Sequence, residues 1–102
     1  MIPQLRDWHE RYEKDGLTIV GVHSPEFLWE RPYEKLAAAT KALGVTYPVV
    51  QDNDFAIWKR YANWAWPSAV IVDRRGVVRY THIGEGAYRE TEDVIRTLLA
   101  EP

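Results

Sequence analysis

Residues 66–84 read WPSAVIVDRRGVVRYTHIG and predict the two adjacent strands around which the rest of the fold is arranged. The apolar run 68–72 and the alternating run 77–83 are rich in β-branched side chains, and the glycine-containing segment 73–76 lies between them. Two such runs separated by a short turn are typical of a β-hairpin. Because proline donates no ladder hydrogen bond, Pro67 fits the entry of the first strand rather than its middle.

Apolar residues at three- and four-residue steps predict helices on both sides of this hairpin. The steps run through residues 2–14 and 33–43, and Gly16 and Gly44 are the expected stops. Pro32 suits the first turn of the second helix, where its missing N–H would have no partner. A final helix is predicted after the hairpin, with this inner stripe: Thr91, Val94, Ile95, Leu98 and Leu99.

Between the first two helices, residues 17–23 form a nearly continuous β-branched run. Such a run is typical of a parallel strand that is covered on both faces. Residues 45–50 are expected to be a short extended connection, and Asp52 or Asp54 is expected to cap a short third helix. The predicted order is therefore αβαα-ββα in one α/β domain, residues 1–102.

The composition is that of one globular domain without a strong charge. The 102 residues are 46% hydrophobic and 13% aromatic, which suffices for a buried core. Thirteen basic against fifteen acidic residues give a net charge of −2, so nucleic acid is not an expected partner. No apolar run is long enough to cross a bilayer, and residues 1–4 do not resemble a signal peptide.

The chain has no cysteine. Disulfide bonds, catalysis by a thiolate and zinc sites with cysteine ligands are therefore excluded within these 102 residues. A chain without thiols is indifferent to the redox state of its compartment, so cysteine usage does not indicate where the protein is located.

Histidines and carboxylates are the remaining candidates for chemistry. His23 and His82 both fall at strand ends, and together with His9 they are the side chains that ordinarily titrate near neutral pH. Their spacing fits no metal-binding motif, so histidines without a special role are favoured, and no metal or other cofactor is expected. Carboxylate pairs for acid–base work would be these: Glu26 with Glu30, and Glu85 with Glu90. Among fifteen acidic residues such pairs arise by coincidence, and Gly-Glu-Gly at 84–86 is expected to be a turn.

Tryptophans gather before the hairpin, and Trp66-Pro67 stands directly at its entry. Trp58 is expected in the core and at least one of Trp64 and Trp66 at the surface, where exposed aromatic rings favour peptide or sugar binding. One interpretation of Trp66-Pro67 is a cis-proline loop that presents backbone groups to a partner chain. The other is an ordinary trans proline at a strand start.

Several short motifs together resemble one family. They follow in this order along the chain: IPQL (2–5), WHERY (8–12), VGVHSPEF (20–27), YPV (47–49), DND (52–54), WP (66–67), VDRRG (72–76) and GEG (84–86). In this combination the chain resembles the thioredoxin-like thiol-disulfide oxidoreductases of the TlpA, ResA and DipZ type, and the DipZ-like branch most of all. The motifs cover nearly the whole chain.

The resemblance implies a thioredoxin-like mixed sheet with flanking helices on both faces. It also implies a domain that is incomplete at its N-terminus, because the family's central strand and its CxxC motif would precede Ile2. In the family that strand lies between the strands that correspond to residues 17–23 and 69–73. Without it, their facing backbone groups would pair directly, exchange with a second copy in a homodimer, or pair with a strand from elsewhere.

The expected function follows from the same resemblance. A thiolate is the nucleophile of disulfide exchange, so a chain without cysteine is expected to be redox-inert by itself. The family's cis-proline loop maps onto Trp66 and Pro67, and Glu26 lies in a stretch that approaches the active-site end. These three residues are the expected binding site for a protein or peptide substrate. The family also implies a location outside the cytoplasm, either periplasmic or membrane-tethered.

Two other functions stay open from the residues alone. The chain would be a non-catalytic module that binds a peptide or partner through the Trp66-Pro67 loop, or a cysteine-free enzyme that works through His23, His82 or the carboxylates. Thiol dependence separates the oxidoreductase from both. Loss of peptide binding on Trp66→Ala separates the binding module from the cysteine-free enzyme.

Overall fold

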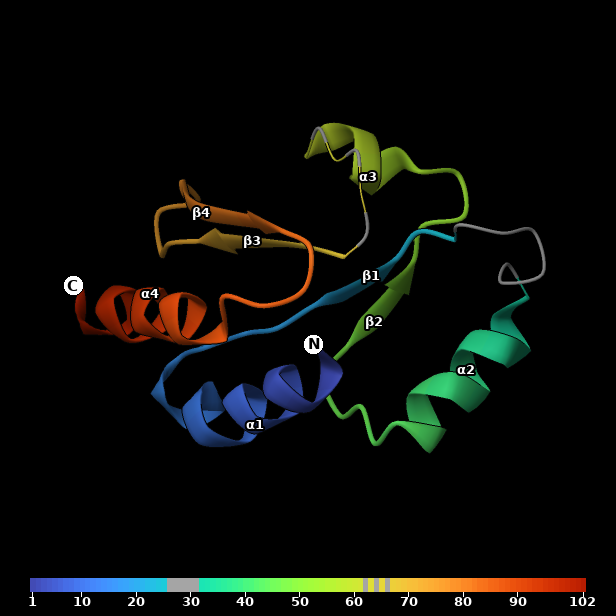
Figure 1. Ribbon diagram of the computed structural model, residues 1–102, viewed down its shortest axis with the longest axis horizontal. Coiled ribbons are helices and arrows are strands. Elements are labelled where there is room, and N and C mark those ends of the chain that lie inside the picture. The colour runs from blue at the N-terminus through green and yellow to red at the C-terminus, as the bar shows by residue number, and fades with distance from the viewer. Residues whose placement is uncertain (26–31, 62, 64, 66) are drawn as a thin grey trace.

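The computed structural model describes residues 1–25, 32–61, 63, 65 and 67–102. Its elements follow in this order: α1 (Ile2–Tyr12), the 3-10 helix η1 (Glu13–Asp15), β1 (Gly21–His23), α2 (Tyr33–Ala42), β2 (Val49–Gln51), α3 (Ala56–Arg60), β3 (Ser68–Val72), β4 (Val78–Ile83) and α4 (Tyr88–Ala100). Figure 1 shows the β3–β4 hairpin and α4 at one end of the molecule and α2 at the other.

The strands of the described residues form two separate pairs. β1 and β2 are parallel, with Gly21 opposite Val49. β3 and β4 are antiparallel, with Ser68 opposite Ile83. The mixed α/β class, with parallel and antiparallel pairing, is confirmed. Of the three outcomes expected for the facing strands, direct pairing is wrong, because β1 and β3 share no ladder.

The hairpin forms as the sequence predicts, and Asp73 holds its turn. Oδ1 of Asp73 accepts hydrogen bonds from the backbone N–H groups of Arg75 at 2.9 Å and Val77 at 3.0 Å. Gly76 has a φ of +83°, a conformation that residues with a side chain rarely adopt. The chemistry of the turn therefore sets the register of the two strands.

Helices α1 and α4 provide most of the small core. The buried hydrophobic side chains among the described residues are these: Trp8, Tyr47, Ile95 and Leu98. The rings of Trp8 and Tyr88 have centroids 6.4 Å apart, so α1 lies against the start of α4. On the hairpin, the hydroxyl of Tyr80 lies 3.0 Å from Oγ1 of Thr91 and joins β4 to the same helix. The inward stripe predicted for α4 is confirmed, with Thr91, Ile95 and Leu98 buried.

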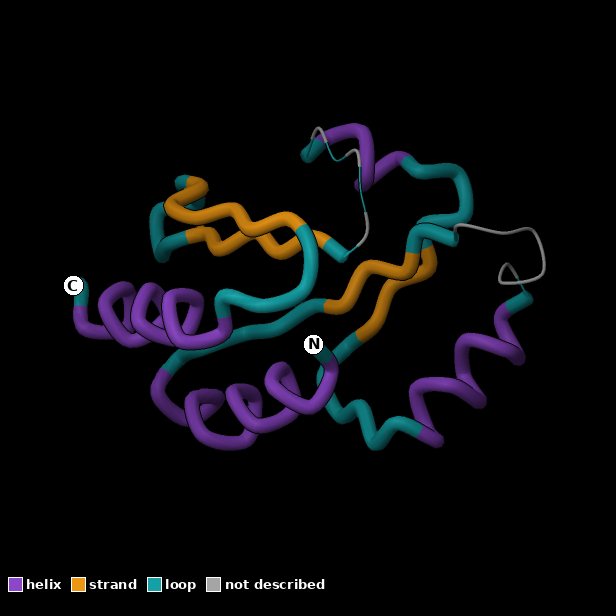
Figure 2. The backbone as a smooth tube through the Cα atoms, in the orientation of Figure 1, coloured by secondary structure: helices purple, strands orange, loops and turns teal. Residues whose placement is uncertain are grey.

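The strand predicted over residues 17–23 is shorter and more exposed than expected. Only Gly21–His23 form β1, and Figure 2 shows the residues before it as a loop. Val20 and Val22 are 52% and 44% exposed, so the prediction of burial on both faces is wrong. Strand side chains point to the faces of a sheet, so these valines lie on a face that other elements leave partly uncovered. β1 pairs with β2, which begins within the segment expected to be a plain connection.

Helix α2 forms where predicted, yet its apolar side is only partly covered, with Leu36 and Thr40 half-buried. The helix begins at Tyr33, directly after Pro32. None of its residues is buried, and Tyr33 is 66% exposed. The prediction that Trp58 of α3 belongs to the core is wrong, because this side chain is half-buried. Its ring lies edge-on to that of Phe55. The apolar patterns of α2 and α3 therefore predict more burial than these two helices have.

Candidate functional site

The carboxyl ends of β1 and β2 point toward one edge of the molecule, where the chain continues into α3 (Figure 1). Two polar residues are buried there, Ser24 directly after β1 and Asp52 directly after β2. The Ser24 hydroxyl donates a hydrogen bond to Oδ2 of Asp52 at 2.8 Å. The backbone N–H of Asp52 donates to the carbonyl of His23 at 2.8 Å. The loops after both parallel strands are thus joined at this edge.

Although Phe55 occupies the N-cap position of α3 itself, Asp52, one of the two predicted cap residues, also accepts hydrogen bonds from the first turn of that helix. Its Oδ1 accepts a hydrogen bond from the N–H of Ile57 at 3.0 Å, and its Oδ2 accepts one from the N–H of Trp58 at 2.9 Å. Burial raises the pKa of Asp52, but these amides and the Ser24 hydroxyl outweigh that effect and hold the pKa below its ordinary value. The carboxylate is therefore charged at neutral pH and positions the edge of the sheet rather than carrying a proton.

Among the three predicted binding residues, Pro67 is described, whereas Glu26 and Trp66 lie outside the described residues. Pro67 is half-buried and directly precedes β3, so its predicted place at the strand entry is confirmed. Its carbonyl accepts a hydrogen bond from the N–H of Gly84 at 2.8 Å, which extends the hairpin ladder by one residue. β3, which Pro67 directly precedes, runs in the direction opposite to that of β1 (Figure 1).

The histidines do not come together as a site. His23 lies in β1 and His82 in β4, which belong to separate sheets. Nε2 of His9 lies 3.3 Å from a carboxylate oxygen of Glu13, one helical turn further along the chain. Within the part of the chain that the structure describes, no group of three or more His, Asp or Glu side chains is arranged to hold a metal ion.

The predicted carboxylate pairs are not assembled either. Glu85 accepts a hydrogen bond from the hydroxyl of Tyr88, whereas Glu90 is exposed on α4. Glu26 and Glu30 lie outside the described residues. The Gly-Glu-Gly segment is a turn, as expected, because both of its glycines have a positive φ, +92° and +100°.

Glu92, which sequence reasoning missed, joins α4 to α1. Its Oε1 accepts a hydrogen bond from Nε1 of Trp8 at 3.1 Å. Its Oε2 accepts one from the Tyr12 hydroxyl at 2.6 Å and another from Nη2 of Arg11 at 3.0 Å. The hydrogen bond from Tyr12 does most to hold the pKa of Glu92 below its ordinary value of 4.5, against the effect of partial burial. The available sequence signal is the inward placement of Trp8 and Tyr12, four residues apart on one helix.

We expect the stability that Glu92 contributes to be lost in acid. Folding lowers its pKa, so the contribution is complete above the unfolded-state value of about 4.5 and disappears as the pH falls through the lower folded-state value. Urea unfolding from about pH 7 to about pH 3 measures it. Glu92→Gln should lower stability at neutral pH and flatten the profile, whereas Glu90→Gln on the exposed side of the same helix should not. Profiles of the same slope for both variants would contradict this assignment.

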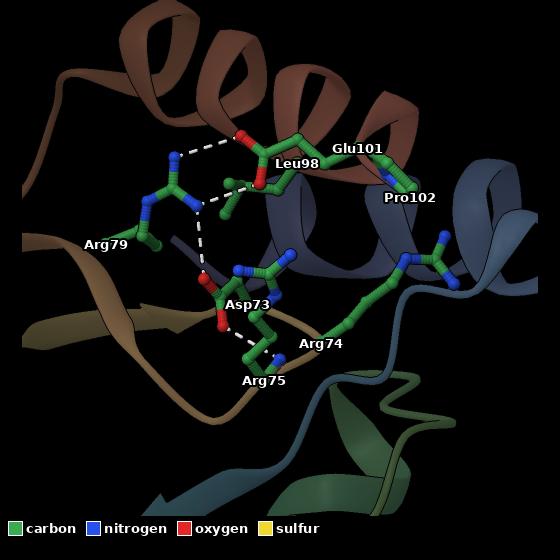
Figure 3. Close-up of a pocket in the computed structure, with 7 residues that line it drawn as sticks. All are labelled: Asp73, Arg74, Arg75, Arg79, Leu98, Glu101 and Pro102. Atoms are coloured by element: carbon green, nitrogen blue, oxygen red, sulfur yellow. Dashed lines mark hydrogen bonds and ion pairs between the residues drawn. The ribbon is translucent and has the colours of Figure 1, made fainter.

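A surface hollow of about 200 Å³ lies between the hairpin turn and the end of α4 (Figure 3). Arg79 donates hydrogen bonds to both carboxylate oxygens of Glu101, at 2.8 and 2.9 Å, and to Oδ2 of Asp73 at 3.1 Å. One guanidinium thus bridges two carboxylates. The cluster therefore fastens the hairpin to the end of α4 and leaves neither of its carboxylates available for chemistry.

Comparison with known proteins decides the family. The model of the AhpC/TSA family matches residues 1–81. The chain belongs to the AhpC/TSA family. Protein DipZ of Mycobacterium bovis is 39% identical to this AhpC/TSA chain over 98 residues, which make up 96% of the chain and 14% of DipZ. The chain therefore spans only a small part of this relative's length.

Solved structures establish the fold of this AhpC/TSA chain. A thiol-disulfide isomerase from Corynebacterium glutamicum superposes with a TM-score of 0.88 at 23% identity, covering 99% of this chain and 70% of that one. A thioredoxin-like protein in its oxidised form superposes with a TM-score of 0.85 at 24% identity, covering 97% and 66%. The fold is thioredoxin-like, and the resemblance to DipZ-type proteins is confirmed. No helix of the described residues is long and apolar enough to cross a membrane.

Proposed function

We propose that residues 1–102 form an N-terminally incomplete thioredoxin-like domain of a DipZ-type thiol-disulfide oxidoreductase. The observation that carries this proposal is a thioredoxin-like fold built without any cysteine. Disulfide exchange needs a thiolate that attacks and a thiol that leaves, and no other side chain replaces them. The chain by itself is therefore redox-inert, and it supplies the scaffold and the binding loop.

The binding part of the proposal concerns the loop before β3. Trp66, Pro67 and Glu26 contact the protein or peptide substrate. Two observations support this placement: Pro67 directly precedes β3, which runs opposite to β1, and the buried Ser24–Asp52 hydrogen bond joins the loops that follow β1 and β2. A location outside the cytoplasm, implied by the family resemblance, completes the proposal.

The lack of cysteine also suits a second function. The chain would then be a non-catalytic module that binds a peptide or partner through the Trp66-Pro67 loop. Pairing or strand exchange between two copies stays a prediction for either function, and sedimentation at micromolar concentration tests it.

The oxidoreductase function is tested by comparing the chain as it is with a form to which a segment containing a CxxC motif has been added. Dithiothreitol should reduce a disulfide-linked fluorescent peptide at the same rate with and without the chain. A form extended before residue 1 by the corresponding DipZ segment, with its strand and CxxC motif, should accelerate the reaction at least about tenfold. Serine in place of either grafted cysteine should abolish the gain.

Two results would count against this function. Turnover by the cysteine-free chain would show a nucleophile other than a thiolate. A graft that folds without becoming active would show that the scaffold does not serve disulfide exchange. In that second case, peptide binding that Trp66→Ala abolishes would assign the non-catalytic module instead.

A further inference from the structure

A groove of about 180 Å³ lies between α2 and the segment that leads into β2, and we call it the α2–β2 groove. The side chains that matter below are Tyr33, Leu36 and Thr40 of α2, and Val45, Tyr47 and Val49 of the following segment. None of the described residues that line this groove carries a charge. The groove therefore has mainly apolar walls, and its volume suits one short aliphatic or aromatic group.

Tyr47 brings a hydroxyl without a partner to this groove. The residue is 6% exposed, and the ring of His9 from α1 packs edge-on against its ring at a centroid distance of 6.0 Å. No hydrogen bond joins the hydroxyl to another group within the described part of the chain. Its oxygen is not among the fully enclosed unpaired side-chain atoms of the described residues, so a ligand can reach it. A nearly buried donor of this kind binds an acceptor on a ligand.

The side chains of Tyr47 and Val49 lie together on one face of the β1–β2 pair. A β-carbon placed on Gly21 of β1 would lie 3.2 Å from Cε1 of Tyr47 and 3.2 Å from Cγ2 of Val49. The ring of His9 contacts Tyr47, and residues of α2 complete the groove. The groove is thus built from three elements that packing already holds in place, namely α1, α2 and β2.

Arg6 of α1 places a positive charge at one end of the groove. Its Nη1 donates a hydrogen bond to the carbonyl of Leu43 at 2.8 Å. A β-carbon placed on Gly44 would lie 3.4 Å from Nη1 and 3.8 Å from Nε, so the guanidinium lies against the residue directly before Val45. It forms no ion pair with any described residue. The guanidinium therefore keeps donors and a full charge for a ligand.

The hydroxyl of Tyr47 is protonated at neutral pH. Burial raises the pKa of Tyr47 above its ordinary value of 10, although the charge of Arg6 acts in the opposite direction. Charges act in this way only over short distances, so the guanidinium lies near the hydroxyl. Both groups donate hydrogen bonds, and the positive charge favours an acceptor that is negative.

We infer that the α2–β2 groove binds a small organic carboxylate with a short aliphatic or aromatic tail. The tail would lie against Leu36, Val45 and Val49. The carboxylate would accept hydrogen bonds from the Tyr47 hydroxyl and the Arg6 guanidinium, and this charge complementarity selects an anion over a neutral or cationic ligand. The inference goes beyond the proposed function, because none of the groove residues named above belongs to the expected substrate site and binding needs no thiol.

Three ligands of similar shape test the site on the full chain. Phenylacetate carries the carboxylate, phenylacetamide replaces it with a neutral amide, and phenethylamine replaces it with a cation. Phenylacetate should cause saturable changes in the NMR chemical shifts of three backbone amides: Thr40, Val45 and Val49. Phenylacetamide should bind at least about tenfold more weakly, and phenethylamine should cause no saturable change.

Two tyrosine variants of the same groove form a matched pair. Tyr47→Phe keeps the ring and removes the nearly buried hydroxyl, so it should weaken the binding of phenylacetate about tenfold. Tyr33 is 66% exposed and lies mostly in water. Tyr33→Phe should therefore change the affinity less than about twofold.

Two arginine variants test the charge. Arg6→Gln should weaken the binding of phenylacetate about tenfold and remove most of its dependence on salt. Arg89 is exposed on α4, which lies at the end of the molecule away from α2 (Figure 1). Arg89→Gln should change the affinity less than about twofold. If one variant does not fold, as judged by circular dichroism, the other pair and the three ligands still decide the question.

Several outcomes would overturn the inference. They are the absence of saturable shifts at the groove amides, equal binding of phenylacetate and phenylacetamide, and equal effects of the two tyrosine variants. Shifts confined to amides outside the groove would overturn it as well. None of these readouts involves the added CxxC segment, so failure here is distinguishable from failure of the proposed function.

Discussion

Replacing Asp52 with alanine is expected to lower the free energy of unfolding by about 3 kcal/mol. The substitution removes the acceptor for the Ile57 and Trp58 amides at the start of α3. It also leaves the buried hydroxyl of Ser24 without its carboxylate partner. Urea unfolding followed by circular dichroism measures the loss, and the melting temperature should fall by about 15 °C.

Asp54 provides the matched control for this experiment. It lies two residues away, carries the same charge and is exposed, and the sequence offered it as the alternative cap. Asp54→Ala should change stability by less than about 0.5 kcal/mol. Equal losses from the two variants would mean that Asp52 does not hold the edge together. Ser24→Ala should cost about 1 kcal/mol, because one donor to the carboxylate is lost.

Trp8→Ala is expected to have the largest effect of all, about 4 kcal/mol. Trp8 is 4% exposed and is one of the few buried hydrophobic side chains of the described chain. It contacts Tyr88 and donates a hydrogen bond to Glu92, so its loss separates α1 from α4. In a chain of this size such a loss leaves little net stability at 25 °C.

Trp8→Phe separates packing from hydrogen bonding at this position. Phenylalanine keeps most of the apolar contact and lacks only the Nε1 donor, so the expected loss is about 1 kcal/mol. Combining Trp8→Phe with Glu92→Gln in a double-mutant cycle measures the coupling between the two helices. A loss below about 1 kcal/mol for Trp8→Ala would show that α1 contributes little to the folded state.

The parts of the fold that were predicted from the sequence depend on neighbours within a few residues. The hairpin follows from two β-branched runs and a turn that Asp73 and Gly76 close locally. The inward stripe of α4 is local as well, and so is the stop at Gly16, which has a φ of +113° and ends the 3-10 helix η1 that follows α1. Asp52 was found as a cap because its partners lie only five and six residues ahead.

The parts that sequence reasoning missed depend on distant segments. The run 17–23 looks like a buried strand, since its composition does not show which elements pack over its faces. Val20 and Val22 lie on a face that stays partly uncovered, and they are exposed. Glu92 resembles any other acidic residue on a helix until α1 brings Trp8 and Tyr12 beside it. The binding residues Glu26, Trp66 and Pro67 remain a prediction drawn from family resemblance.

The two strand pairs differ in how far apart their partners lie along the chain. β3, β4 and α4 occupy consecutive stretches of residues 68–100, whereas β1 meets β2 only across α2. Closing a short loop costs less entropy than closing a long one, so the hairpin half should form early and the parallel pair late. In a refolding experiment the amides of the hairpin and α4 should therefore become protected against hydrogen exchange before those of β1 and β2.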